Sequence, residues 1–323
     1  MRAIAFAGFA LALGACTPSP EGEASDQTHD AGMGMTELKI FRTEEAAHRA
    51  HDLYREYLDS WPIAHEEKLV STRFGDTFVV ASGSEAAPAV VLLHGTMATA
   101  AMWRDEIRTL VRDYRVYAVD VIGDAGFSAP VRPPTSTDAH ALWLQDVLDG
   151  LGQPSAHFVG LSLGGWLSLD FATRRPERVD SLTLITPGGV ADKNIIVWAL
   201  PLLMLGSWGA EKVRERIVGR SQGDQTEDQR TLSAFSAAIF EGMRPRTESL
   251  RTFSDDELAG LDMPILVLLG ADDVTMDSKE IEQRFRQFVP QSEVNVFPGM
   301  RHFLGNQAEA INKFLNGTSR VQE

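Results

Sequence analysis

The chain has 323 residues, 44% of them hydrophobic, and a formal net charge of −15. This length suits one large α/β domain with room for an inserted subdomain. The acidic balance argues against a nucleic-acid partner, because a phosphate backbone needs a basic face, and it disfavours the attraction of anionic substrates.

The first sixteen residues, MRAIAFAGFALALGAC, have the layout of a secretory signal peptide. Arg2 precedes an apolar segment, and small residues lead into Cys16, the one cysteine of the sequence. The final Leu-Gly-Ala-Cys resembles a bacterial lipoprotein signal, in which the cysteine is lipidated. We therefore expect the protein in the cell envelope, attached to a membrane only through Cys16. An ordinary cleaved signal is the alternative, and translation from Met33 or Met35 would make the protein cytoplasmic.

Residues 17–36 form a segment rich in Pro, Ser, Gly and acidic side chains. Such a composition buries too little apolar surface to offset the entropy lost on ordering, so we expect a flexible tether. The folded body then starts with an amphipathic helix over 43–58, with Thr43 as its N-cap. Two short strands are expected near 67–73 and 77–81.

From residue 89 onward, continuous apolar runs alternate with helical patterns. Such runs are typical of strands buried on both faces of a parallel sheet, and their alternation with helices predicts helices on both faces. The expected fold is therefore α/β, with a mostly parallel sheet of the eight-stranded type. The expected strands are 89–93, 115–121, 156–161, 181–186, 264–270 and 293–298, and the expected helices are 102–112, 139–151, 163–174, 278–288 and 303–314.

One long interval, residues 187–263, breaks this alternation. A structureless loop of that length is uncommon in a compact domain. The interval contains helical patterns and several large apolar side chains. We therefore expect a helical cap, inserted into a core that is made of residues 37–186 and 264–323.

The pentapeptide 160–164, GLSLG, fits the pattern Gly-x-Ser-x-Gly. It follows an expected buried strand and opens an expected helix, the context in which a nucleophilic serine stands on a sharp strand-to-helix turn. The glycines leave room for neighbouring backbone, and the helix N-terminus favours developing negative charge. Ser162 is therefore the expected nucleophile.

A serine nucleophile needs a general base, because its hydroxyl is a weak nucleophile at neutral pH. His302 is the one histidine after Ser162, and it follows the last expected strand. An acid that orients the imidazole should follow an earlier strand. The loop after 264–270 contains both Asp272 and Asp273.

Two backbone N–H groups should bind the oxyanion that forms during acyl transfer. One belongs to Leu163, directly after the nucleophile, and the other to the loop after strand 89–93. In that loop Thr96 is the expected donor and Met97 is the alternative. His94 is expected to be structural and to form hydrogen bonds inside the loop.

Five motifs together resemble proteins of the α/β-hydrolase fold, carboxylesterase-like type, over about residues 65–315. These motifs are LLHGTMATAAMW, VYAVDVIGDAGFSAP, VGLSLGGWLSL, LVLLGADDVTM and PGMRHF. The resemblance implies an acid three residues after the glycine that ends its strand, which selects Asp273. It also implies a cap before that strand and no metal or organic cofactor. The segment from Asp120 to Ser128 departs from the usual Asp-x-x-Gly-x-Gly-x-Ser, so its residues receive no role by analogy.

The expected activity is hydrolysis of a small apolar carboxylic ester through an acyl-enzyme. Candidate substrate-binding residues are Met97, Trp103, Trp166 and Trp198, although the tryptophans also suit the core. Carbon–carbon bond hydrolases, lactonases, amidases and perhydrolases use the same three catalytic side chains and remain alternatives. A hydrolase-like small-molecule receptor is a further alternative.

Overall fold

The computed structural model describes residues 40–191, 199, 201–202, 204–219, 227–246 and 248–319. The expected signal sequence with Cys16, the expected tether 17–36 and the candidate pocket residue Trp198 lie outside the described residues. Within these ranges, no helix combines the length and the apolar character needed to span a bilayer.

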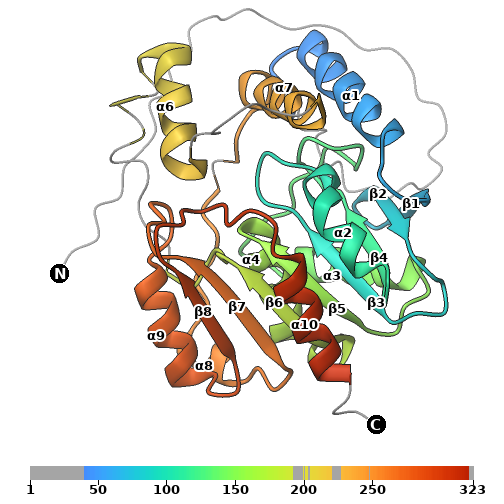
Figure 1. Ribbon diagram of the computed structural model, residues 1–323, viewed down its shortest axis with the longest axis vertical. Coiled ribbons are helices and arrows are strands. Elements are labelled where there is room, and N and C mark those ends of the chain that lie inside the picture. Colours follow the sequence, from blue (N-terminus) through green and yellow to red (C-terminus); the bar gives the residue numbers. More distant parts are fainter. Residues whose placement is uncertain are drawn as a thin grey trace, which may run out of the picture. The chain divides into compact units, whose positions relative to one another are not determined.

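Eight strands form the sheet that organises the protein (Figure 1). They are β1 (His65–Thr72), β2 (Gly75–Ser82), β3 (Ala89–Leu93), β4 (Arg115–Val119), β5 (Ala156–Leu161), β6 (Val179–Ile185), β7 (Ile265–Gly270) and β8 (Glu293–Phe297). Their order across the sheet is β1-β2-β4-β3-β5-β6-β7-β8. β2 is antiparallel to both of its neighbours, and all other pairs are parallel. This confirms the expected eight-stranded, mostly parallel sheet.

Helices cover both faces of this sheet. The described helical segments are α1 (Glu44–Asp59), η1 (Ala100–Trp103), α2 (Arg104–Leu110), α3 (Ala139–Gly150), α4 (Leu163–Arg174), η2 (Pro176–Arg178), α6 (Gly206–Val218), α7 (Glu227–Gly242), α8 (Asp255–Ala259), α9 (Ser278–Phe288) and α10 (Ala308–Ser319). Val91 and Leu93 of β3 belong to a buried cluster with side chains of α3, α4, α8 and α9. Val90 and Leu92 belong to a second cluster with α1, α2, α7 and α10. Because adjacent strand residues point to opposite faces, the continuous apolar run reflects burial on both sides.

Helix α1 confirms the helix expected over 43–58, and the hydroxyl of Thr43 caps it by accepting the N–H of Ala46 at 3.1 Å. This helix precedes the part of the chain that resembles the family, yet it packs beside α7 (Figure 1). The rings of Tyr54 and Phe235 stack with their centroids 5.3 Å apart. Helix α1 therefore packs against the interval between β6 and β7.

The interval expected as a helical cap contains α6, α7 and α8. Both of its ends, however, pack into the core. Val190 and Ala191 at one end, and Leu258 and Met263 at the other, belong to the same buried cluster as α4. The part that could act as a cap is therefore shorter than residues 187–263.

The last helix begins later than the sequence pattern suggests. A helix was expected over 303–314, but α10 starts at Ala308, where Asn306 Oδ1 accepts the Ala308 N–H at 2.8 Å. Leu304 is buried in the core without being helical. Because Leu304 is apolar, the helical pattern of the sequence includes the loop that follows His302, although that loop is not helical.

Candidate active site

Ser162 stands where β5 ends and α4 begins. Its backbone has φ 54° and ψ −107°, in a region that residues other than glycine rarely adopt. Hydrogen bonds hold this turn on both sides. The Ser162 N–H donates to Ile185 O at 2.9 Å, and the Ser162 carbonyl accepts the N–H groups of Trp166 and Gly188 at 3.0 and 3.1 Å. A strained residue held in this way marks a candidate functional position.

The glycines at 160 and 164 are required by close backbone contacts. A Cβ atom on Gly160 would overlap the backbone of Gly164, and a Cβ on Gly164 would overlap the carbonyl oxygen of Leu93. The first turn of α4 therefore lies directly against β5 and β3. The N–H groups of this helix terminus supply partial positive charge next to Ser162.

Asp273 and His302 come together from the loops that follow β7 and β8. Asp273 Oδ2 lies 2.7 Å from His302 Nδ1. The carboxylate is fully buried, whereas the imidazole keeps 13% of its surface exposed. Gly270 permits this approach, because a Cβ there would overlap the carbonyl oxygen of Arg301. The neighbouring Asp272 is exposed.

Thr275 completes the surroundings of the Asp273 carboxylate. Its N–H and its hydroxyl donate to Asp273 Oδ1 at 2.7 Å each, and the hydroxyl oxygen lies 2.8 Å from His302 Nδ1. Burial by itself would raise the pKa of Asp273, but the hydrogen bond and charge of His302 and the two bonds from Thr275 hold that pKa below its usual value. Thr275 was not among the predicted residues. An Asp followed two positions later by a residue that donates to it is a local turn signal that could have indicated it.

Ser162 and His302 are linked through the end of β6. Ile185 accepts the Ser162 N–H, and the next residue, Thr186, donates its hydroxyl to His302 O at 3.1 Å. In the part of the chain that the structure describes, the Ser162 hydroxyl has no hydrogen-bond partner, so a Ser162–His302 hydrogen bond is not formed. Such contacts are often long in free enzymes and shorten when substrate binds.

Comparison with known proteins identifies the family of this chain. A family model described as the alpha/beta hydrolase fold matches residues 88–256, more than half of the chain. The chain belongs to the α/β-hydrolase fold family. A relative in Bacillus subtilis (strain 168), the "uncharacterized carboxylesterase nap", is 34% identical over 292 residues, which is 84% of this chain and 94% of the relative.

Two crystal structures of Bacillus subtilis proteins extend this likeness to three dimensions. Naproxen esterase (carboxylesterase NP) is 33% identical with a TM-score of 0.73, over 85% of this chain and 99% of that one. Carboxylesterase CesB (YbfK) is 31% identical with a TM-score of 0.72, over 85% and 98% of the two chains. This α/β hydrolase is thus carboxylesterase-like along nearly the whole length of these relatives.

In this α/β hydrolase the loop after β3 lies beside Ser162. A Cβ on Gly95 would come within 3.5 Å of Ser162 Cβ. Among the described residues, the N–H groups of Thr96 and Leu163 have no hydrogen-bond acceptor. Both donors are therefore available to a substrate oxygen that lies close to Ser162.

The other groups of this loop are already engaged. The N–H of Met97, the alternative donor, bonds to Asp124 Oδ1 at 2.9 Å. His94 Nδ1 lies 2.8 Å from Gly95 O, and His94 Nε2 accepts the Val121 N–H at 2.9 Å. Burial lowers the pKa of His94 to about 4, so the imidazole is neutral and Nδ1 carries its proton. This leaves Thr96 as the better placed of the two candidate donors.

Two of the candidate pocket residues lie in the core. Trp103 and Trp166 are both completely buried, one in each of the two core clusters. The Trp166 indole donates to Arg251 O at 3.0 Å. Met97 is partly buried and packs against the cluster that contains Trp103.

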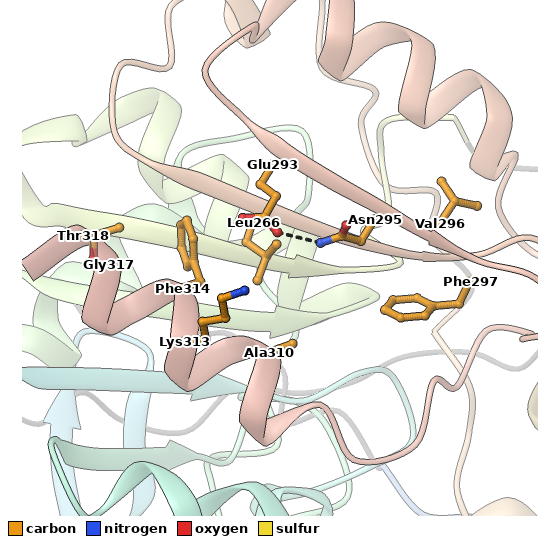
Figure 2. Close-up of a pocket in the computed structure, with 10 residues that line it drawn as sticks. All are labelled: Leu266, Glu293, Asn295, Val296, Phe297, Ala310, Lys313, Phe314, Gly317 and Thr318. Atoms are coloured by element: carbon orange, nitrogen blue, oxygen red, sulfur yellow. Dashed lines mark hydrogen bonds between the residues drawn. The ribbon is translucent and has the colours of Figure 1, made fainter.

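A groove lies away from the candidate active site. The groove in Figure 2 lies between β8 and α10, where Asn295 and Phe297 face Lys313 and Phe314. It contains none of the residues of the candidate active site. Across the described ranges, no three His, Cys, Asp or Glu side chains are grouped as ligands for a metal ion.

Proposed function

We propose that this protein is a serine esterase that cleaves a small apolar carboxylic ester through an acyl-enzyme. Ser162 is the nucleophile, His302 the general base and Asp273 the acid. The observation that carries the proposal is that the buried Asp273 carboxylate lies 2.7 Å from His302 Nδ1. The loop that contains His302 is hydrogen-bonded to the end of β6, and so is the turn that contains Ser162. The relatives named as carboxylesterases support an ester substrate.

The roles follow from where the protons are. With Nδ1–H donated to Asp273, His302 Nε2 has the lone pair that takes the proton from Ser162 Oγ. The oxygen then attacks the ester carbonyl carbon, and the N–H groups of Thr96 and Leu163 bind the resulting oxyanion. The tetrahedral intermediate collapses as His302 protonates the leaving alcohol. Water, deprotonated by His302, releases the acid and restores the serine.

Turnover of p-nitrophenyl esters from acetate to decanoate tests this proposal. We expect hydrolysis that is abolished in Ser162→Ala and unchanged in Ser136→Ala, a matched variant at an exposed serine. The acyl chain length with the highest kcat/KM would then indicate the size of the acyl-binding site. If Ser162→Ala retains the wild-type rate, the mechanism is wrong. If a fluorophosphonate labels Ser162 but no ester is hydrolysed, the result would instead favour the carbon–carbon hydrolase or receptor alternatives.

The proposed location is the cell envelope, with lipid attachment at Cys16. The signal-like residues 1–16 and the polar segment 17–36 support it. Membrane fractionation of wild type and Cys16→Ser tests it. We expect the wild type in the membrane fraction and the variant in the soluble fraction, and identical fractionation would contradict the anchor.

A further inference from the structure

Two buried aspartates in the loop after β4 hold the loop after β3. Asp120 Oδ1 accepts the N–H of Ala100 at 2.8 Å, and Asp124 Oδ1 accepts the N–H of Met97 at 2.9 Å. Both carboxylates are inaccessible to solvent or nearly so. Thr96, whose N–H is the proposed oxyanion donor, precedes these two anchor points.

The bond to Asp124 holds a strained residue. Met97 has φ 59°, in the left-handed region that a β-carbon disfavours. The peptide groups on both sides of Thr96 are therefore fixed, one by the bond from His94 to Gly95 O and the other by the bond from Met97 to Asp124. The Thr96 N–H belongs to the same planar peptide group as Gly95 O, and the bond from Met97 to Asp124 fixes the following peptide group. The two bonds together limit rotation about the backbone of Thr96.

Arg246 forms an ion pair with the other oxygen of the Asp124 carboxylate, with no hydrogen bond between the two groups. Arg246 Nε lies 3.6 Å from Asp124 Oδ2, and the Arg246 side chain is only 8% exposed. A terminal nitrogen of Arg246 also donates to Ile122 O at 2.6 Å, in the same loop as Asp124. Arg132 donates to Arg244 O at 2.7 Å and so ties the segment that carries Arg246 to this loop.

A buried ion pair of this kind needs an explanation other than stability. Burial raises the pKa of Asp124 to about 6 against the opposing charge of Arg246, and burial lowers the pKa of Arg246. Replacing such a pair by apolar side chains of similar volume is often neutral or stabilising, because both charges lose their hydration on folding. Fixing the position of a neighbouring group is a role that apolar side chains would not fulfil.

We propose that Asp124, held in place by Arg246, is a positioning residue that orients the 95–97 loop so that the Thr96 N–H points at the reacting carbonyl oxygen. The inference rests on the proposed function, because it concerns the oxyanion of the same reaction. Asp124 does not touch the reacting atoms. It acts through the backbone of Met97.

Two double variants distinguish the hydrogen bond from Met97 to residue 124 from the effect of the ion pair with Arg246. Asp124→Asn with Arg246→Met removes both charges but keeps an oxygen that accepts the Met97 N–H. Asp124→Leu with Arg246→Met has a similar shape and no acceptor. We expect the Asn variant to retain kcat within about threefold of wild type and the Leu variant to lose about 100-fold in kcat, with KM within about threefold in both. Should the Leu variant fail to fold in a thermal melt, Asp124→Ala with Arg246→Met replaces it.

The affinity for an aryl trifluoromethyl ketone provides a second readout, because this probe forms an oxyanion on the nucleophilic serine. It should weaken in the Leu variant in parallel with kcat and stay near wild type in the Asn variant. Equal kcat in the two variants, or a change confined to KM, would overturn the positioning role. Wild-type turnover that survives Ser162→Ala would show instead that the proposed function itself is wrong.

Discussion

Asp273 and His302 are 29 positions apart in the chain, yet Asp273 Oδ2 and His302 Nδ1 are separated by 2.7 Å. The carboxylate has no exposed surface, so solvent does not screen its interaction with the imidazole. A buried, ionised acid of this kind fixes the tautomer of the histidine and stabilises its protonated form.

Replacing Asp273 by Asn should therefore lower kcat by about three to four orders of magnitude, because the amide cannot stabilise the imidazolium. Asp272→Asn is the matched control, since Asp272 is the adjacent aspartate and is exposed. Its kcat should stay within about twofold of wild type. Steady-state kinetics on one p-nitrophenyl ester compares the two, and a larger loss in Asp272→Asn would reverse the assignment.

Thr275→Val should lower kcat by about tenfold, because it removes the hydroxyl that donates to Asp273 Oδ1 at 2.7 Å. The factor corresponds to a hydrogen bond to a charged group, about 1.5 kcal/mol. Thr275→Ser keeps the hydroxyl and should retain most of the wild-type kcat. Equal rates for Thr275→Val and wild type would show that the hydroxyl does not help to orient the pair.

The loop that carries His302 also holds the end of helix α6. Arg301 donates to Glu215 O, and the His302 N–H donates to Ile217 O at 3.3 Å. A cation at a helix C-terminus stabilises the last turn by about 0.3–1 kcal/mol. Arg301→Gln should therefore speed amide hydrogen exchange in the last turn of α6 by about two- to fivefold. Arg286→Gln on α9 is the control, and identical exchange in the two variants would refute this link.

His140 should contribute to the loss of stability in acid. Burial, with a smaller effect of the Arg246 charge, lowers the pKa of His140 to about 3 from an ordinary value of 6.5. Between these two pH values the unfolded chain binds a proton at His140 that the folded chain does not. The free energy of unfolding therefore falls as pH falls through this window, by up to about 1.4 kcal/mol per pH unit for one proton.

Replacing His140 by Phe removes this titration while keeping a ring that can pack against Trp166, whose centroid lies 5.4 Å from the imidazole. We expect urea unfolding to give similar stabilities for wild type and His140→Phe at pH 8, and a more stable variant at pH 5. His94 titrates with the same sign in both proteins and cancels in the difference. A stability difference that does not change with pH would contradict the assignment.

The sequence was most informative where the chemistry depends on neighbours in the chain. The pentapeptide around Ser162 and the strand before it predicted the turn, because its glycines are required by local backbone contacts. Continuous apolar runs predicted the strands, because both faces of the sheet are buried. Residues that follow parallel strands meet at one edge of a sheet, so the approach of Asp273 and His302 could also be expected.

Contacts between distant segments that do not both follow neighbouring parallel strands could not be predicted in this way. Asp124 and Arg246 form a pair only because the chain returns from α7 to the loop after β4. No periodic pattern in the sequence indicates such a contact. The segment that contains Asp124 also departs from the usual family motif, so the motif assigned no roles to its residues. The burial of a single tryptophan could not be predicted either. From the sequence, Trp103 and Trp166 suit a pocket and a core equally well, and the structure places both indoles in the core.

Ser162 is the proposed nucleophile, and reaction with a fluorophosphonate followed by intact-mass and peptide mass spectrometry identifies the residue that reacts. We expect one adduct per chain, located on the peptide that contains Ser162, and none in Ser162→Ala. An adduct on a different residue, or labelling that persists unchanged in Ser162→Ala, would contradict it.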